Sequence, residues 1–417
     1  MKKYIIINLI TLIFCLYPIT TFASLNQYTW STYELATEVS NNLDAESIND
    51  SSNPLNLDCG SCILMEQHTG KILYSYNSHE SLRPASVTKL MSIYLIMEAI
   101  QNGKINYDTL IPCSEHAESM GGSQIWLTTT EKLTVDEMLK AICVVSANDC
   151  VTAMAEYLGG TEENFVTMMN EKAKALGMND SCFKNCHGID EDGHVMSSYD
   201  IGILSCALLN QYPEITKYTT IYMDSLRDGK SSLVNTNKLV RNYSGCTGLK
   251  TGSTSLALYN LSASASRNGM DLVAVVMKAP TSKIRFSNAS SLLDYGFTNF
   301  EYKKLLNQND IIKTVNVNKG VSPTINAISL NDIGVIVSKG NETNIEQNIS
   351  IPNNIDAPIN LGDIVGNVTF VLNGETLAQC DIVSGTEVSK ISIMSMGKRI
   401  FNDWFGLCRW LKNLGTH

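Results

Sequence analysis

Three short segments of the chain carry side chains that could take part in acyl transfer. Ser86 and Lys89 are one helical turn apart, so a hydroxyl and an amine would share one face of a helix that begins there. An apolar run follows Lys89 at once, and a desolvated lysine has a lowered pKa, so its neutral amine can accept the serine proton. The pair predicts a nucleophile with its own base, although Ser-x-x-Lys alone is common at solvated helix starts.

The second segment is Ser146-Ala147-Asn148, in a predicted turn between two helices, and the third is Lys250-Thr251-Gly252, which leads into a strand hairpin. In isolation, Asn148 or Asp149 would simply be the N-cap of the next helix. Gly252 has no side chain, so a substrate peptide could approach that strand closely and pair with it. Each segment indicates little alone. The three together, at a helix start, in a loop and on a strand, favour one shared site.

Helices and strands that could position these residues follow from the spacing of apolar residues. Hairpins are predicted at 62–76 and, around Asn268-Gly269, at 256–278. The segment 90–100 is apolar on nearly every side and is predicted to be a buried helix. Hairpin, helical block, hairpin and helix predict an α+β domain with helices packed on an antiparallel sheet. Further helices are predicted after the capping box Thr134-Val-Asp-Glu137 and over 149–158, 161–176, 198–211 and 284–295.

The three motifs are similar to the set found in penicillin-binding proteins and class A β-lactamases. The chain resembles the low-molecular-weight penicillin-binding proteins, the serine-type D-alanyl-D-alanine carboxypeptidases of peptidase family S11, at motif level from about residue 57 to 300. That resemblance implies the penicillin-recognising transpeptidase/β-lactamase-like fold. Three further segments support it: Arg83-Pro-Ala-Ser-Val-Thr-Lys89, His187-Gly-Ile-Asp190 with Asp192-Gly193, and Asn260-Leu-Ser-Ala263.

The resemblance also implies a role for each site residue. Ser86 attacks the carbonyl between the two terminal D-alanines of a peptidoglycan stem peptide, Lys89 takes its proton, and Ser146 passes a proton to the leaving amine. Water then hydrolyses the acyl-enzyme, β-lactams acylate the same serine, and no metal or other cofactor takes part. Backbone N–H groups of Ser86 and Ser253 would form the oxyanion hole. The implied substrate-binding residues are Asn148, Lys250, Thr251, Gly252 and Ser253.

Two alternatives stay open. A class A-like β-lactamase would share the motifs, but its deacylating Glu-x-x-x-Asn pattern does not follow the Ser146 loop. A catalytically idle wall-binding scaffold on the same fold would be expected to lose Ser86 or one of the lysines, and none is lost. Some members of the family that the chain resembles offer an arginine to the substrate carboxylate, about fifteen residues before Lys-Thr-Gly. Here that stretch reads Asn235-Thr-Asn-Lys238, which leaves carboxylate recognition to Thr251 and Lys250.

Length indicates more than one domain, and the pattern at the N-terminus indicates export. The 417 residues, 44% of them hydrophobic, suffice for two or three domains. A net charge of −10 without a basic block argues against a nucleic-acid partner. Residues 1–23 are typical of a signal peptide and 24–56 of a polar linker. The catalytic domain is expected at 57–300 and a small β-rich domain, a spacer or interaction module, at 301–392.

Residues 393–417 are predicted to contain an amphipathic helix that lies on a membrane surface. Its apolar side includes Phe401 and Trp404, and Lys398, Arg399 and Lys412 flank that side. A helix this short and basic would lie in the interface without crossing the bilayer. Docking on its own protein is the alternative. Together with the signal peptide, the helix predicts a protein tethered to the outer face of the cytoplasmic membrane.

The twelve cysteines are scattered, and several lie within apolar runs, where they can serve as small core residues. Cys59-Gly-Ser-Cys62 and Cys182-x-x-x-Cys186-His187 have spacings that a disulfide or a metal could use. Structural zinc is disfavoured, because a single C-x-x-C is a weak signal. Buried thiols in a reducing habitat fit the pattern at least as well.

Overall fold

The computed structural model describes residues 50–340 and 345–392, together with residues 397, 401 and 404. The predicted signal peptide and most of the predicted linker lie outside the described residues. The predicted C-terminal helix does too, apart from three positions in helical conformation, of which Phe401 is 58% and Trp404 60% exposed. The described chain contains an α+β domain followed by an all-β domain.

A five-stranded sheet forms the centre of the α+β domain, in the order β2-β1-β9-β8-β7, and every neighbouring pair is antiparallel. Both predicted hairpins are present. Asn268 and Gly269 connect β8 to β9 with φ angles of 54° and 77°, the left-handed conformations that a type I′ turn requires. The strands are β1 (Ser61–Glu66), β2 (Ile72–Tyr76), β7 (Cys246–Thr254), β8 (Leu258–Arg267) and β9 (Met270–Ala279).

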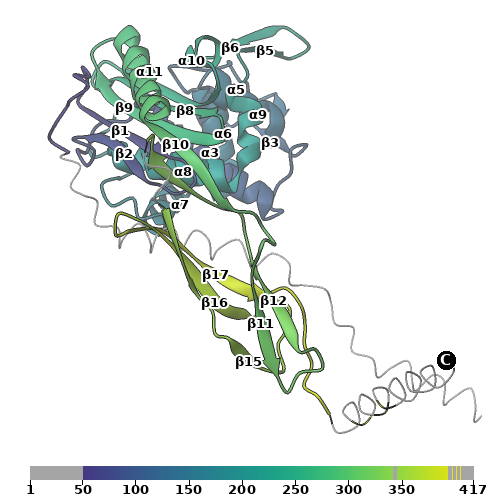
Figure 1. The fold of residues 1–417 in the computed structure, drawn as a ribbon. Coiled ribbons are helices and arrows are strands. Elements are labelled where there is room, and N and C mark those ends of the chain that lie inside the picture. Colours follow the sequence, from purple (N-terminus) through teal and green to yellow (C-terminus); the bar gives the residue numbers. More distant parts are fainter. Residues whose placement is uncertain (1–49, 341–344, 393–396, 398–400, 402–403, 405–417) are drawn as a thin grey trace, which may run out of the picture. The chain divides into compact units, whose positions relative to one another are not determined.

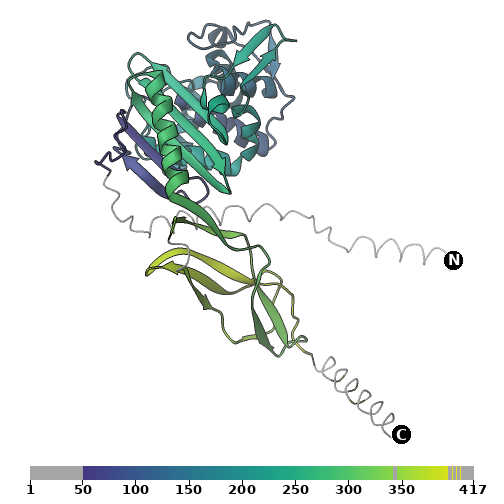
Figure 2. The ribbon, with the colours of Figure 1, turned by 45° about the horizontal axis from the view of Figure 1, so that its top comes forward.

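Helices pack on both faces of this sheet. Figure 2 shows α11 (Ser282–Asn299) lying across one face, where Leu292 and Leu293 join a core that includes Leu64 and Val276 from the strands. The opposite face carries the helical block, with α8 (Ser198–Gln211) against β1 and β9 (Figure 1). The predicted α+β architecture is confirmed.

The helical block is built around α3 (Lys89–Gln101), which is buried on nearly all sides, as its apolar sequence predicted. The capping box before α5 is present, because the Thr134 hydroxyl accepts from Glu137 N while the Glu137 carboxylate accepts from Thr134 N. The other elements are η1 (Ala85–Thr88), α4 (Glu115–Glu118), α5 (Val135–Val144), α6 (Asn148–Gly159), α7 (Glu162–Ala175), η2 (Pro213–Ile215), α9 (Thr216–Thr219), α10 (Leu239–Asn242) and the short strands β3 (Leu110–Pro112), β4 (Lys132–Thr134), β5 (Met223–Leu226) and β6 (Ser231–Val234).

The first described residues already contact the domain, although their composition placed them in the linker. Asp50 accepts the backbone N–H of Ser78 with its carboxylate, at 2.8 Å for the closer oxygen. Asn53 accepts the Tyr74 hydroxyl at 2.9 Å. These bonds fasten residues 50–53 beside β2.

The second part is all β, in agreement with the sequence analysis. A six-stranded sheet has the order β14-β16-β17-β12-β11-β15, and β10 pairs separately with β13. Val315, Ile325, Val368 and Ile382 belong to its own apolar core. The strands are β10 (Phe300–Leu306), β11 (Ile311–Asn318), β12 (Thr324–Ser329), β13 (Ile333–Ser338), β14 (Ile345–Ser350), β15 (Asn354–Asp356), β16 (Ile364–Leu372) and β17 (Glu375–Ser384).

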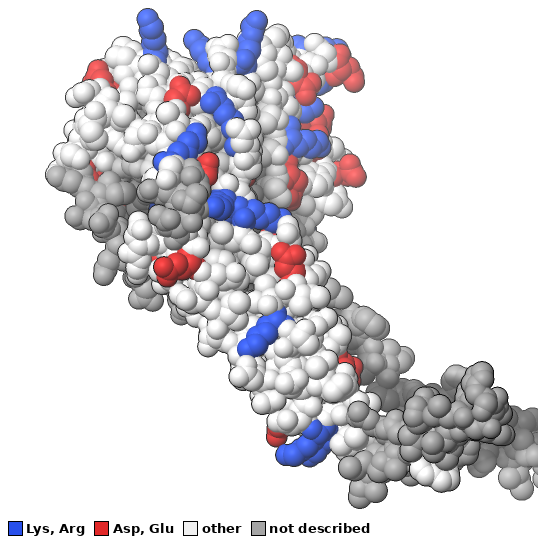
Figure 3. Space-filling view, in the orientation of Figure 1, with Lys and Arg blue, Asp and Glu red and all other residues white. Residues whose placement is uncertain are grey.

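Charged side chains of both signs are interspersed over the described part of the face shown in Figure 3. Among the helices that the structure describes, none combines the length and the apolar character needed to cross a bilayer.

Candidate active site

The predicted nucleophile lies in a turn that is held between two glycines. Ser86 is in η1, just before α3, and the preceding Ala85 has a φ of 49°, which is strained for a residue with a side chain. A Cβ on Gly252 would lie 2.7 Å from Pro84 O and 2.9 Å from Ser86 N. A Cβ on Gly188 would lie 1.9 Å from Ala85 O. Only glycine fits on either side of the nucleophile turn, which is thereby fixed in position.

Two side chains from distant segments support this turn. Asn260 on β8 donates to Arg83 O at 2.8 Å and accepts from Lys278 N at 2.7 Å, which ties the turn to the sheet. Thr88 donates to Ala85 O at 2.8 Å and lies 2.8 Å from His194 Nε2. Burial lowers the pKa of His194 to about 4, so the neutral ring donates to Thr88 through Nε2 and accepts from Lys184 N through Nδ1.

Lys89 is fully buried at the start of α3, one turn after Ser86. Its Nζ lies 3.0 Å from Ser86 Oγ, 2.6 Å from Asn148 Oδ1 and 2.7 Å from His187 O. Burial, and then the charge of Lys250, lower the pKa of Lys89 well below its usual value. The predicted pairing of nucleophile and desolvated amine is therefore present.

The Ser146 turn connects α5 to α6, as predicted. Ser146 is 4% exposed with a φ of 66°, and its Oγ has no hydrogen-bond partner among the described residues. Asn148 donates its side-chain N–H to Gly121 O at 2.7 Å and its backbone N–H to Ser123 O at 2.7 Å. A strained residue with an unpartnered buried hydroxyl beside such an anchored amide is typical of a functional site.

The alternative that Asn148 or Asp149 is the N-cap of the next helix is wrong. Ala147 is the N-cap of α6 and makes no side-chain cap bond. Asp149 instead lies fully buried, and one of its oxygens accepts both Ile125 N and Leu127 N at 3.0 Å. Asp149 thus binds a neighbouring loop to the turn.

Lys250, Thr251 and Gly252 lie on β7, at the edge of the sheet, and Ser253 follows them as an exposed residue. Lys250 is 1% exposed and donates to Thr251 O at 3.0 Å. Burial, helped by the charge of Arg285, lowers the pKa of Lys250 to about 7. Two buried amines, those of Lys89 and Lys250, therefore interact electrostatically in one site.

Arg285 of α11 supports β7 from behind. Its guanidinium donates to Gly252 O at 3.2 Å and to Asn260 O at 3.1 Å, and burial lowers its pKa to about 10. One buried cation thus fixes both the motif strand and the strand that anchors the nucleophile turn.

The Asn235-Thr-Asn stretch places Thr236, and no arginine, beside the motif strand. The Thr251 hydroxyl donates to Thr236 Oγ at 2.7 Å, and Thr236 N donates to Val144 O at 3.1 Å, just before the Ser146 turn. The flanking side chains hold this position, because Asn235 donates to Ile221 O at 2.7 Å and Asn237 to Gly248 O at 2.9 Å. The two threonine hydroxyls form a pair at the site.

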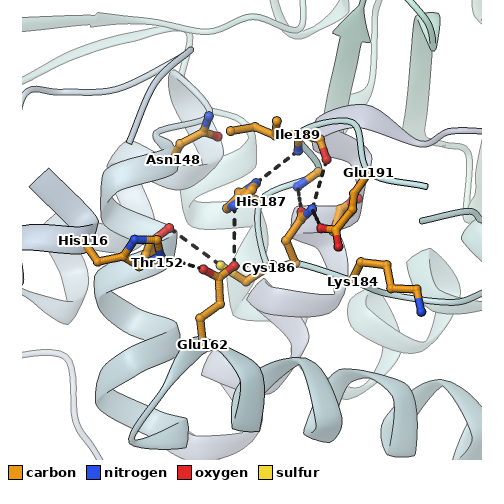
Figure 4. A network of polar contacts seen from close by, with 12 residues as sticks. His116, Asn148, Thr152, Glu162, Lys184, Cys186, His187, Ile189 and Glu191 are labelled. Carbon is orange, nitrogen blue, oxygen red and sulfur yellow. Dashed lines mark hydrogen bonds and ion pairs between the residues drawn. The ribbon is translucent and has the colours of Figure 1, made fainter. Parts of the chain in front are cut away.

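The loop that supplies His187 O is fixed from behind by Glu162, as Figure 4 shows. Glu162 accepts Cys186 N at 3.0 Å and lies 3.0 Å from His116 Nε2 and 3.5 Å from His187 Nε2. Burial lowers the pKa of His187 to about 4, so its ring is neutral. A cavity of about 270 Å³ beside this loop is lined in part by Glu162, Lys184 and His187.

The ten cysteines that the structure describes are all free thiols. Within the described residues, no group of three or more His, Cys, Asp or Glu side chains is arranged to hold a metal ion.

A serine paired with a desolvated lysine, a second hydroxyl in a strained turn and a second buried lysine on an edge strand define a serine acyl-transfer enzyme. Comparison with known proteins specifies the class further. Residues 48–281 match the peptidase S11 family, described as D-alanyl-D-alanine carboxypeptidase, and residues 300–390 match the C-terminal domain of penicillin-binding protein 5.

Relatives match over most of their length. The chain is 42% identical over 348 residues to the D-alanyl-D-alanine carboxypeptidase DacF of Bacillus subtilis, covering 82% of this chain and 89% of DacF. It is 30% identical over 364 residues to DacC of Escherichia coli, covering 84% and 90%. Penicillin-binding protein 5 from Haemophilus influenzae superposes with a TM-score of 0.71 at 29% identity, over 81% of this chain and all of that one.

Penicillin-binding protein D2 from Listeria monocytogenes, solved in its ampicillin-bound form, matches with a TM-score of 0.54 at 28% identity, over 59% of this chain and all of that one. The chain belongs to the peptidase S11 family. It is a serine-type D-alanyl-D-alanine carboxypeptidase that acts on peptidoglycan. The resemblance, the two-domain fold and the activity expected from the sequence are confirmed, and the β-lactamase and idle-scaffold alternatives are not supported.

Several residues that shape the site were not singled out from the sequence. Thr236, Arg285 and His194 act through partners far away along the chain, so no local pattern marks them. Gly188 and Asn260 stood in segments that supported the resemblance, but their contacts with the nucleophile turn were not predicted.

Proposed function

We propose that Ser86, Lys89 and Ser146 carry the hydrolysis of the terminal D-Ala-D-Ala bond through an acyl-enzyme on Ser86. The observation that carries this proposal is the set of partners around Lys89 Nζ. Asn148 Oδ1 and His187 O can only accept hydrogen bonds, so they occupy both N–H groups of a neutral amine. The remaining lone pair faces Ser86 Oγ at 3.0 Å and can take its proton.

In the acylation step, Ser86 Oγ forms a bond to the carbonyl carbon while its proton moves to Lys89. The C–N bond to the terminal D-alanine then breaks, and the leaving amine takes a proton from the Ser146 hydroxyl, which is replenished from Lys89. The unpartnered state of Ser146 Oγ supports this relay, because no other described residue competes for its proton. Backbone N–H groups of Ser86 and Ser253 would stabilise the oxyanion, at about 3–4 kcal/mol for each donor.

In deacylation, a water molecule adds to the ester carbon as Lys89 takes one of its protons. The ester C–O bond breaks, Ser86 regains its proton, and the shortened stem peptide leaves. β-Lactams would acylate the same hydroxyl, and water would hydrolyse the resulting acyl-enzyme slowly. The ampicillin-bound Listeria relative supports this part of the proposal.

The substrate peptide would lie along β7 as an added strand, since β7 is the edge of the sheet. Lys250 would attract the terminal carboxylate, and the hydroxyls of Thr251 and Thr236 would bind it. Asn148 would position the substrate amide as well as Lys89. Gly252 lets the strand approach the nucleophile turn, where a side chain would prevent it.

We also propose that the protein is exported and held at the outer face of the cytoplasmic membrane. The signal-peptide pattern of residues 1–23 and the basic amphipathic pattern of residues 393–417 support this placement.

The mechanism is tested by locating the covalent adduct. We expect benzylpenicillin to add its full mass to the intact protein and, after proteolysis, to the peptide that contains Ser86. Under the same conditions a free pentapeptide should release D-alanine. An adduct on any other residue would reject the assignment of the nucleophile.

A further inference from the structure

Trp126 is exposed to solvent on a loop whose backbone is held by hydrogen bonds. It is 75% exposed, the highest value among the exposed large hydrophobic residues of the described chain. Its φ of 56° is strained for a bulky side chain, yet Ile125 and Leu127 on either side are 3% and 2% exposed. A loop that could relax would bury the ring and relieve the strain. The arrangement persists because the surrounding bonds fix it.

Two side chains, those of Asp149 and Arg227, make these bonds to residues 125–127. Asp149 accepts the N–H groups of Ile125 and Leu127, each at 3.0 Å. Arg227, in the turn between β5 and β6, donates to Ile125 O at 2.8 Å and to Trp126 O at 3.4 Å. Arg227 is itself paired with Glu131. Its Nε donates to Glu131 Oε1 at 2.5 Å and its Nη2 donates to Glu131 Oε2 at 2.7 Å. The backbone that carries the exposed Trp126 ring is therefore fixed in position.

The same loop borders the active site. Gly121 O and Ser123 O both accept hydrogen bonds from Asn148, which contacts Lys89. Three residues of extended chain span at most about 11 Å, so the Trp126 backbone lies within that distance of Ser123. The loop that carries Trp126 therefore lies beside a residue that contacts Lys89.

We propose that Trp126 is a stacking platform for a sugar of the glycan strand that carries the stem peptide. A pyranose ring presents C–H groups on its faces and hydroxyls at its edges, so it packs on an aromatic face that has hydrogen-bonding neighbours. The exposed residues of the loop supply such neighbours: Ser119, Ser123, Thr128, Thr129 and Thr130, with the half-buried amide of Gln124. This inference rests on the acylation mechanism proposed above.

Other occupants fit the loop less well. A protein partner needs a contiguous patch of roughly 800 Å² on each side, whereas the neighbours of Trp126 along the chain are buried or polar. An anionic membrane surface attracts lysine and arginine, whereas Arg227 is neutralised by Glu131, and the exposed Glu118 ends α4 just before the loop. The polar, hydroxyl-rich surroundings favour a carbohydrate.

The first test compares two substrates that differ only in the sugar. D-Alanine release is measured from a free pentapeptide and from the same pentapeptide attached to an N-acetylated disaccharide. We expect Trp126→Ala to lower the ratio of kcat/KM, glycan-linked over free, at least 10-fold and chiefly through KM. Trp126→Tyr should keep the ratio within about threefold of the wild type. Leu110→Ala, which removes another exposed apolar side chain, is the matched control and should leave the ratio unchanged.

The second test needs no activity. Binding of a peptide-free N-acetylglucosamine tetramer to the Ser86→Ala protein is followed by tryptophan fluorescence and by NMR, with and without Trp126→Ala. Saturable binding that the second substitution weakens at least 10-fold supports the platform, even if the acylation mechanism were wrong. The proposal is overturned if Trp126→Ala leaves the substrate ratio unchanged or lowers kcat/KM equally for both substrates. It is also overturned if Trp126→Ala weakens binding to anionic vesicles and leaves binding to the tetramer unchanged.

Discussion

Asn148 presents its side-chain oxygen to Lys89 at 2.6 Å while its side-chain nitrogen donates to Gly121 O at 2.7 Å. The second bond fixes the orientation of the amide, because only the nitrogen can donate to a carbonyl. The group that faces Lys89 is therefore an uncharged acceptor. It orients the amine without stabilising the ammonium form as a carboxylate would.

Replacing that acceptor with a charge should disable the base. Asn148→Asp places a carboxylate against Lys89, which should raise the lysine pKa by roughly 1–3 units. The acidic limb of the pH profile of penicillin acylation should move upward by a similar amount, so at a fixed pH on that limb the rate should fall by about 10- to 1000-fold. Asn164→Asp, on exposed α7, is the control. An acidic limb that stays in place would contradict the role of Lys89 as base.

The two lysines should give a bell-shaped pH profile. Lys89 must be neutral, so kcat/KM should rise with pH through its lowered pKa, and Lys250 must be charged, so kcat/KM should fall as pH passes about 7. Lys250→Arg keeps the charge at high pH and should move the descending limb upward by more than one unit, whatever its effect on the maximum. Lys283→Arg, exposed on α11, should leave both limbs in place.

Lys250 should also reduce stability at neutral pH. Its folded pKa of about 7 is depressed from 10.5, so between these values the unfolded chain binds more protons and the free energy of unfolding rises with pH. The slope is at most about 1.4 kcal/mol per pH unit. Lys250→Met should raise the Tm near pH 7, remove this pH dependence and abolish activity. Calorimetry from pH 6 to 10 measures both effects, and a lower Tm for the variant would refute the argument.

Gly252→Ala should displace the nucleophile turn. The new Cβ would lie 2.7 Å from Pro84 O and 2.9 Å from Ser86 N, contacts that backbone atoms cannot relieve without moving. We expect acylation by penicillin to fall at least 100-fold while the folded state survives. In Gly60→Ala the nearest atoms belong to the side chains of Lys278 and Leu82, so this control should be acylated normally. Equal acylation of both variants would show that the turn can adjust.

Thr236 should contribute to binding of the substrate carboxylate. Thr236→Val removes one hydroxyl of the Thr236–Thr251 pair and should lower kcat/KM for a free-acid peptide by about 10- to 100-fold, since hydrogen bonds to charged groups contribute roughly 1.5–3 kcal/mol. The loss of kcat/KM should be smaller for a peptide whose terminal carboxylate is replaced by an amide. Thr236→Ser should retain most of the wild-type activity. Thr220→Val, at an exposed hydroxyl, is the control. The same loss on acid and amide would argue for a purely structural role.

Removal of residues 393–417 should release the protein from membranes. We expect the truncated protein in the soluble fraction of cells, with unchanged D-alanine release from a short peptide, because none of the site residues lies in this segment. A truncated protein that stays in the membrane fraction would contradict the proposed tether.

Those parts of the site that depend on local spacing were predictable from the sequence. Ser86 and Lys89 are one turn apart, so a helix brings them together whatever surrounds it. The Asn268-Gly269 turn and the Thr134 capping box are likewise local, and both are present. The apolar run after Lys89 predicted its burial, and hence the direction of its pKa shift.

The contacts that fix the site across the fold were not predictable in this way. Asp149 is acceptable as a helix N-cap by local rules, but it binds the 125–127 backbone, because those N–H groups are buried beside it and need an acceptor. Thr236 faces Thr251 because Asn235 donates to carbonyls of α9 and of Ile221, and Asn237 donates to a carbonyl of β7. Such partners follow from the packing of helices and strands and not from the spacing of residues within one segment.

The nucleophile turn is confined between Gly188 and Gly252, and this has a consequence for drug resistance. Any larger residue at either position would collide with backbone atoms of the turn, so neither wall can be rebuilt by a single substitution that keeps the serine in place. Variants that escape a β-lactam while still trimming the cell wall should therefore carry their substitutions at other positions than Gly188 and Gly252. Inhibitors whose contacts are concentrated on the walls of the turn should retain their potency longest.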